Sequence, residues 1–137
     1  MAENIRLEVV TPEKSVVSDD VQIVMAPGSL GEFGVLSGHT PFLTTLKLGS
    51  IRYKNDKGQD RCVFVSGGFA EALPDRVTVL AESAERRKNI DIERASAALE
   101  RAQERIEKTN EDIDFTRAKA ALERALHRIK LAETRMK

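Results

Sequence analysis

Two apolar stripes at helical spacing in the last third of the chain restrict its fold more than any other feature. Within each stripe the apolar residues recur three and four positions apart. The first stripe consists of Ile92, Ala95, Leu99, Ala102 and Ile106, and the second of Phe115, Ala118, Leu122, Ala125, Ile129, Ala132 and Met136. A polar stretch from Asn110 to Asp114 separates them. This spacing predicts two helices that fold back on each other as an antiparallel hairpin.

The seam of this predicted hairpin alternates large residues with alanine, so it buries little apolar surface. A buried methylene group contributes only about 0.8 kcal/mol, and an isolated helix of roughly 15 residues is marginal in water. We therefore expect the hairpin to need a docking surface and to be able to exchange one surface for another. Asp91 is expected to cap the first helix, and Thr109 with Asp112 resembles a capping box for the second.

The first 84 residues show the twofold alternation of β-strands instead. Apolar and polar residues alternate at 5–9, and further strands are expected at 16–17 and 21–26. Asn55-Asp56-Lys57-Gly58 between two apolar runs is typical of a β-hairpin turn. Many short strands without a βαβ rhythm predict an antiparallel β-sandwich or flattened barrel of about ten strands. Together with the two helices, this predicts an α+β fold.

The balance of basic and acidic side chains also changes where the predicted strands end, near residue 84. Residues 1–84 carry 8 basic and 11 acidic side chains, whereas residues 85–137 carry 14 basic and 11 acidic ones. A basic tail suits an acidic partner, and a solvated helix surface is the other interpretation. We expect a sandwich in residues 1–84, a charged linker in 85–90 and a helical hairpin in 91–137.

Several classes of function lack support in the residues. The single cysteine, Cys62, excludes an internal disulfide and fits a reducing compartment. No apolar run approaches the roughly 18 residues of a membrane span, so we expect no direct membrane insertion. His39 and His127 lie far apart, with no further ligand at metal-binding spacing. We therefore expect neither a catalytic site nor a metal site.

The predicted helices carry clustered arginines. Arg124 and Arg128 lie one helical turn apart on one face, where like charges repel by about 0.2–0.5 kcal/mol unless an anion lies nearby. Two interpretations are open from the spacing. The arginines form ion pairs with acidic residues on neighbouring turns, or they form an anion site, because guanidinium groups match the geometry of phosphates.

Short motifs spread over the whole chain carry a family resemblance. They are the glycine-rich stretch 31–38, the Gly38-His39-Thr40-Pro41 sequence that ends it, Ser66-Gly67-Gly68-Phe69, the strand 77–81, and Ile90-Asp91-Ile92-Glu93-Arg94-Ala95. In this order they resemble the epsilon subunit of bacterial F-type ATP synthase. The resemblance implies a β-sandwich followed by two helices.

The resemblance also implies a role as a non-catalytic rotor subunit on the cytoplasmic face of the bacterial cell membrane, held there by its partners. The sandwich would bind the gamma subunit and the c-ring, with Glu32 and His39 as contact residues, and would help to couple proton flow to ATP synthesis. The hairpin would extend toward the alpha/beta catalytic head and block ATP hydrolysis. No required cofactor and no nucleic-acid partner are implied.

Some members of this family bind ATP in the compact hairpin. Their pattern maps here onto Asp91, Arg94, Arg124 and Arg128, with Glu85 as a further candidate, so the resemblance favours the anion-site interpretation and implies ATP as a regulatory ligand. A different class of function stays open on the residues themselves. The chain would then be a free-standing interaction module whose coiled-coil hairpin clamps client proteins.

Overall fold

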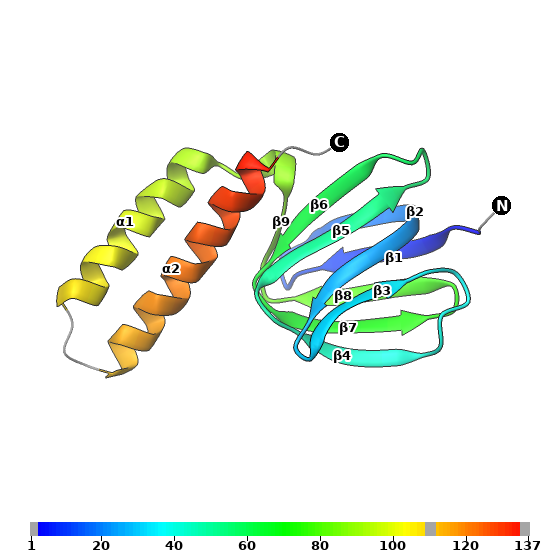
Figure 1. The fold of residues 1–137 in the computed structure, drawn as a ribbon, viewed down its shortest axis with the longest axis horizontal. Helices are drawn as coiled ribbons and strands as arrows, with labels where there is room; N and C mark the ends of the chain where they lie inside the picture. Colours follow the sequence, from blue (N-terminus) through cyan, green and yellow to red (C-terminus); the bar gives the residue numbers. More distant parts are fainter. Residues whose placement is uncertain (1–2, 109–111, 135–137) are drawn as a thin grey trace. The chain divides into compact units, whose positions relative to one another are not determined.

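The computed structural model describes residues 3–108 and 112–134, and the chain divides into two compact units between Arg86 and Arg87. In the described residues the first unit is built of strands and the second of helices (Figure 1). The strands are β1 (Ile5–Val10), β2 (Ser15–Gly28), β3 (Gly31–Val35), β4 (Phe42–Leu46), β5 (Gly49–Asn55), β6 (Asp60–Val65), β7 (Gly68–Leu73), β8 (Arg76–Ala81) and β9 (Ala84–Arg86). The helical elements are the short 3-10 helix η1 (Arg87–Asn89), α1 (Ile92–Lys108) and α2 (Asp112–Glu133).

The long strand β2 organises the sandwich because it pairs with four other strands. Its first half pairs with β1, its second half lies between β3 and β5, and its last residue pairs with β4. Further pairs join β4 to β7, β7 to β8 and β8 to β1, so these strands and β2 close into a ring. β5, β6 and β9 continue the sheet on the other side of β2. The predicted flattened barrel is confirmed, with nine strands in the described residues.

Alternation along the strands builds the core of the sandwich. In β1 the side chains of Ile5, Leu7 and Val9 are buried, while Arg6 between them is exposed. Close packing between two strands also requires glycine at position 68. A Cβ atom at Gly68 would lie 2.1 Å from the backbone oxygen of Leu80, so only glycine allows β7 to approach β8 there.

Three features of the sandwich differ from the expectation. The strands expected at 16–17 and 21–26 are one strand, because the intervening Ser18 and Asp20 side chains bond to Arg6 on β1 and the pairing continues. The pair β1–β8 is parallel, whereas the other strand pairs in the described residues are antiparallel. The linker expected at 85–90 is shorter, because residues 84–86 form β9 and pair with β6.

The helical hairpin has a seam made mainly of alanine. α1 and α2 lie side by side and run in opposite directions (Figure 1), as predicted. The buried side chains of the two helices, within the described residues, are Ala95, Ala102, Ala118, Ala125 and Leu131. The large residues of the predicted stripes are less buried than expected, and Phe115 is 46% exposed. The seam is therefore even thinner than the sequence predicted. Thr109 and Met136, and the side chain of Asp112, lie outside what the structure describes.

Candidate functional site

The head of α1 carries two of the residues predicted for nucleotide binding. Asp91 lies just before the helix, and its Oδ1 accepts a hydrogen bond from the backbone amide of Arg94 at 3.1 Å. The Asp91 carbonyl also accepts the first intrahelical bond, from the Ala95 amide at 3.0 Å. Asp91 is thus the N-cap of α1, as predicted. Both Asp91 and Arg94 are exposed to solvent.

The other two predicted helical residues lie on α2, toward its C-terminal end. Arg124 and Arg128 are one turn apart and partly buried. The Arg87 Nε atom, just before α1, donates a hydrogen bond to the Leu131 carbonyl at 2.9 Å, so the tail of α2 lies beside the head of α1. At 1.5 Å of helix rise per residue, Arg128 lies only about 5 Å along the axis from Leu131. The structure therefore brings the two arginines to the same half of the hairpin as Asp91 and Arg94.

Glu85 is placed differently. It lies on β9, opposite Phe64 of β6, and so belongs to the sandwich unit. The sequence predicted a linker position there, with Glu85 as a further candidate for the nucleotide site. Four of the five predicted nucleotide-site residues thus share one unit, and Glu85 does not.

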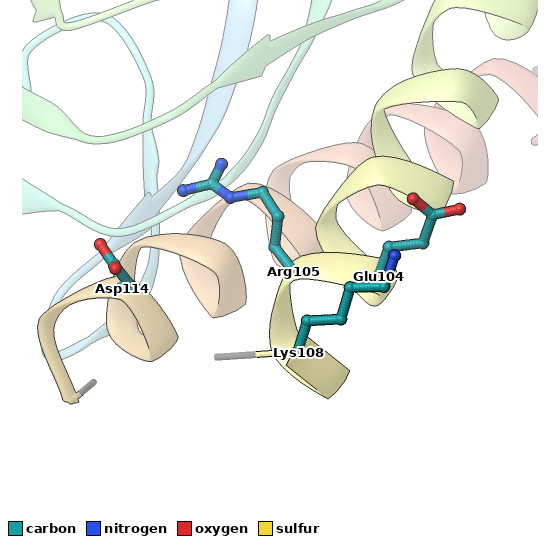
Figure 2. A pocket seen from close by; sticks show the side chains of 4 residues that line it. All are labelled: Glu104, Arg105, Lys108 and Asp114. Atoms are coloured by element: carbon teal, nitrogen blue, oxygen red, sulfur yellow. The ribbon is translucent and has the colours of Figure 1, made fainter. Parts of the chain in front are cut away.

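A hollow lies at the opposite end of the hairpin. It has a volume of about 460 Å³ and is lined by Glu104, Arg105 and Lys108 of α1 and by Asp114 of α2 (Figure 2). No predicted site residue lines it. Among the described residues that line it, two side chains are cationic and two are anionic, so they provide no net positive charge for an anion such as ATP.

The two residues predicted to contact partners lie at different ends of β3. Glu32 is near its start and forms an ion pair with Arg52 of β5, in which Arg52 Nη2 lies 2.6 Å from Glu32 Oε1. His39 lies beyond its other end, where its Nδ1 is 2.6 Å from the Thr40 carbonyl oxygen and its ring meets Phe42 at a centroid distance of 6.3 Å. The strand between them spans about 10 Å from Glu32 to Val35. Glu32 and His39 therefore lie toward opposite ends of β3.

An exposed apolar surface on the sandwich was missed by the sequence reasoning. Phe69 of β7 lies opposite Leu80 of β8, and Leu80 lies opposite Val10 of β1. Phe69 is 54% exposed, Leu80 is 57% exposed, and Leu43 of the adjacent strand β4 is 70% exposed. We call these four residues the outer stripe. A hollow of about 350 Å³ is lined by Val10, Phe69 and Leu80.

The signal for the outer stripe was present in the sequence. Strand 77–81 carries apolar residues on both of its faces, and Phe69 and Leu43 stand where polar side chains would be expected. Contiguous exposed apolar side chains usually mark a site of protein interaction. The outer stripe is therefore a candidate partner surface on the described sandwich.

A polar hollow of about 320 Å³ lies elsewhere on the sandwich, and several of the side chains that line it bond to one another. Arg6 pairs with Asp20 at 3.3 Å, and the Tyr53 hydroxyl donates a hydrogen bond to Asp19 at 3.4 Å. Burial raises the pKa of Tyr53, and Arg86 partly opposes that increase. These contacts link strands distant in sequence, so the hollow has a structural role.

The described residues contain no group of three or more histidine, cysteine or acidic side chains placed to hold a metal ion. Within the same residues, no helix is both long and apolar enough to span a membrane. Cys62 is buried in β6.

Two family models match the chain in succession. Residues 4–87 match the ATP synthase, Delta/Epsilon chain, beta-sandwich domain, and residues 88–133 match the ATP synthase, Delta/Epsilon chain, long alpha-helix domain. The first match ends one residue beyond the boundary between the two structural units.

Curated relatives agree with these models. The ATP synthase epsilon chain of Desulfosudis oleivorans is 67% identical over 107 residues, which cover 78% of this chain and 80% of that one. The ATP synthase epsilon chain of Desulforapulum autotrophicum is 69% identical over 106 residues, which cover 77% of this chain and 78% of that one.

A solved structure supports the fold. A chain of the Euglena gracilis mitochondrial ATP synthase superposes with a TM-score of 0.78 at 23% identity, covering 92% of this chain and 79% of that one. The structure and the family models agree on a sandwich followed by a helical domain. The chain therefore belongs to the ATP synthase delta/epsilon family, among the epsilon chains, which are non-catalytic central-stalk subunits of F-type ATP synthase.

Proposed function

We propose that this chain joins the rotor of a bacterial F-type ATP synthase, helps to couple proton flow to ATP synthesis, and restrains ATP hydrolysis through its helical hairpin. The observation that carries the proposal is the match of two ATP synthase Delta/Epsilon chain models to nearly the whole chain, one for each structural unit. In this role the chain is peripheral, at the cytoplasmic face of the cell membrane, and is held there by its partners.

The sandwich is the part proposed to bind the rotor. The Euglena gracilis chain that superposes on this one belongs to an assembly that contains F1 and a c-ring. The outer stripe supports binding of the gamma subunit, because its exposed phenylalanine and leucine side chains gain from burial against a protein surface. Glu32 and His39, at opposite ends of β3, are proposed to contact different parts of gamma and the c-ring.

The hairpin is the part proposed to regulate. Its alanine seam buries little apolar surface, so the free energy that holds α2 on α1 is small and a partner can compete for it. Its basic α2 is proposed to meet acidic loops of the alpha/beta catalytic head. ATP is proposed to bind the compact form through Arg94, Arg124 and Arg128, with Asp91 holding the head of α1, and to oppose extension.

The experiment is to remove the hairpin from the assembled enzyme. A chain that ends after Arg86 keeps all nine strands described here, including β9. It should fold and bind gamma, and the enzyme that carries it should hydrolyse ATP faster than the enzyme with the full chain. An equal or lower rate at equal assembly would overturn the inhibitory role, whereas failure to bind gamma would overturn the role of the sandwich.

A further inference from the structure

Arg87, the first residue of η1 in the segment before α1, is hydrogen-bonded to the end of α2. Its Nε donates to the Leu131 carbonyl at 2.9 Å, and its Nη2 donates to the Ala132 carbonyl at 3.3 Å and to the Thr134 carbonyl. These three acceptors belong to the last turn of α2 and the residue after it. One side chain thus spans from the segment before the first helix to the end of the second.

The chemistry of this contact favours an arginine. The last carbonyls of a helix have no amide partners further along the helix and carry the negative end of its dipole. A guanidinium group is always charged and presents several donors in a fixed plane, so it can satisfy several of these carbonyls at once. Lysine would keep the charge and lose the fork.

The neighbouring residue, Arg86, makes comparable side-chain contacts within the sandwich unit. The Arg86 Nε donates to the Val16 carbonyl at 2.9 Å, and its Nη2 lies 3.6 Å from Asp19 Oδ2. Both of these partners are on β2, inside the sandwich unit. Two consecutive arginines are therefore fastened to different units, Arg86 to the sandwich and Arg87 to the hairpin.

The weak seam makes the Arg87 contact important. Four of the five buried side chains of the described helices are alanines, which contribute little dispersion or hydrophobic stabilisation. At one end of the hairpin the chain itself connects α1 to α2. At the other end, Arg87 hydrogen-bonds the tail of α2 to the segment before α1.

We propose that Arg87 is a clasp that closes the open end of the hairpin and must release the end of α2 before α2 can leave α1. The clasp itself depends only on the contacts above. Its use as a control point for inhibition rests on the proposed function.

Hydrogen exchange on the full chain tests the clasp. In Arg87→Ala the amides at the C-terminal end of α2 should exchange about tenfold faster than in the wild type, because opening no longer breaks charge-assisted hydrogen bonds. Arg87→Lys should lie between the two. The matched control is Lys88→Ala, which removes the same charge from the next residue, an exposed one, and should leave α2 as in the wild type.

Arg86→Ala provides the opposite control. It should speed exchange in β9 and leave the end of α2 protected. Unchanged exchange of α2 in Arg87→Ala, or an equal effect of Lys88→Ala, would overturn the clasp. Protection of β5 and β6 serves as the check that each variant is folded, and if Arg87→Ala failed that check, the Arg87→Lys and Lys88→Ala comparison would decide.

Hydrolysis by the assembled enzyme tests the regulatory role separately. With the hairpin easier to open, Arg87→Ala should hydrolyse ATP more slowly than the wild type. Faster exchange with an unchanged rate would keep the clasp and overturn its regulatory role. Failure of the proposed function itself would appear elsewhere, as an unchanged rate after the hairpin is removed.

Discussion

The Asp91 carboxylate accepts a hydrogen bond from the Arg94 backbone amide at 3.1 Å, so these two residues are joined before any ligand binds. This contact gives Asp91 a structural role as the helix cap. It also restricts the part that Asp91 can play in a nucleotide site, because a carboxylate repels phosphate groups. We infer that Asp91 acts there by fixing the start of α1 and the position of Arg94.

Asp91→Ala should therefore destabilise the hairpin by about 1 kcal/mol, the usual effect of removing an N-cap. Asp91→Asn should reduce the stability of the hairpin much less, because the asparagine side-chain oxygen can still accept the hydrogen bond. Helix unfolding followed by circular dichroism would measure both variants. Equal stability of Asp91→Ala and the wild type would show that the cap does not contribute.

The proposed ATP site makes a separate prediction about Arg124 and Arg128. ATP should raise the melting temperature of the full chain, since a ligand at a hundredfold excess over its Kd stabilises by about 2.7 kcal/mol. Arg124→Ala or Arg128→Ala should remove most of that increase. Arg117→Ala is the matched control, because Arg117 is an exposed arginine nearer the start of the same helix, and it should keep the increase.

Titration calorimetry is the measurement that could refute the proposed ATP site. If millimolar ATP produced no heat with the wild-type chain, the site would be refuted. Arg124 and Arg128 would then be assigned to partners in the catalytic head.

The outer stripe makes a prediction about binding rather than stability. Phe69→Lys should weaken the affinity for the gamma subunit at least about tenfold, since it places a charge in an interface that we expect to be apolar. The melting temperature should change little, because Phe69 is 54% exposed. Phe69→Leu is the control and should bind nearly as the wild type. Equal binding by Phe69→Lys would assign gamma to another face.

Local chemistry explains which elements the sequence predicted. The caps and apolar spacing of helices act over a few residues, so α1 and its N-cap Asp91 were predictable. The same holds for the turn between β5 and β6, where the Gly58 amide bonds to the Asn55 carbonyl at 3.0 Å and Gly58 has a φ of 78°. Each of these features is determined by residues that lie within a few positions of one another in the sequence.

The features that were missed depend on residues far apart in the chain. β9 exists because residues 84–86 pair with β6 and because Arg86 reaches Val16, 70 positions away. The continuity of β2 through Asp19 and Asp20 depends on the basic side chains of Arg86 and Arg6. No periodicity within a short window can show such pairings, and for the same reason the position of Glu85 on β9 was not predicted.

The position of β3 predicts how Glu32 and His39 meet their partners. Cysteines introduced at the two positions should crosslink in the assembled enzyme to different sites on gamma or the c-subunits, because they lie at opposite ends of the strand. The native Cys62 is buried and should give little background. Crosslinks only to the catalytic head would show that the sandwich is oriented the other way round.

His127 predicts that acid weakens the hairpin. Burial lowers the pKa of His127 below its ordinary value of 6.5, and the nearby positive charge of Lys130 lowers it further. The unfolded chain therefore takes up a proton near pH 6.5, while the folded hairpin takes it up only at lower pH. Between these two values the unfolded state binds more protons, so the stability of the hairpin is fully present above pH 6.5 and declines as the pH falls through the folded pKa.

The measurement is hydrogen exchange in α2 between pH 5 and pH 8, corrected for the intrinsic pH dependence of exchange. Protection should fall on the acid side in the wild type and change less in His127→Gln, which has no proton to gain. His39→Gln alters a histidine in the sandwich and should follow the wild type. Identical acid profiles for the wild type and His127→Gln would show that another group controls the response, and lower salt should enlarge the part due to Lys130 because the charges are then less screened.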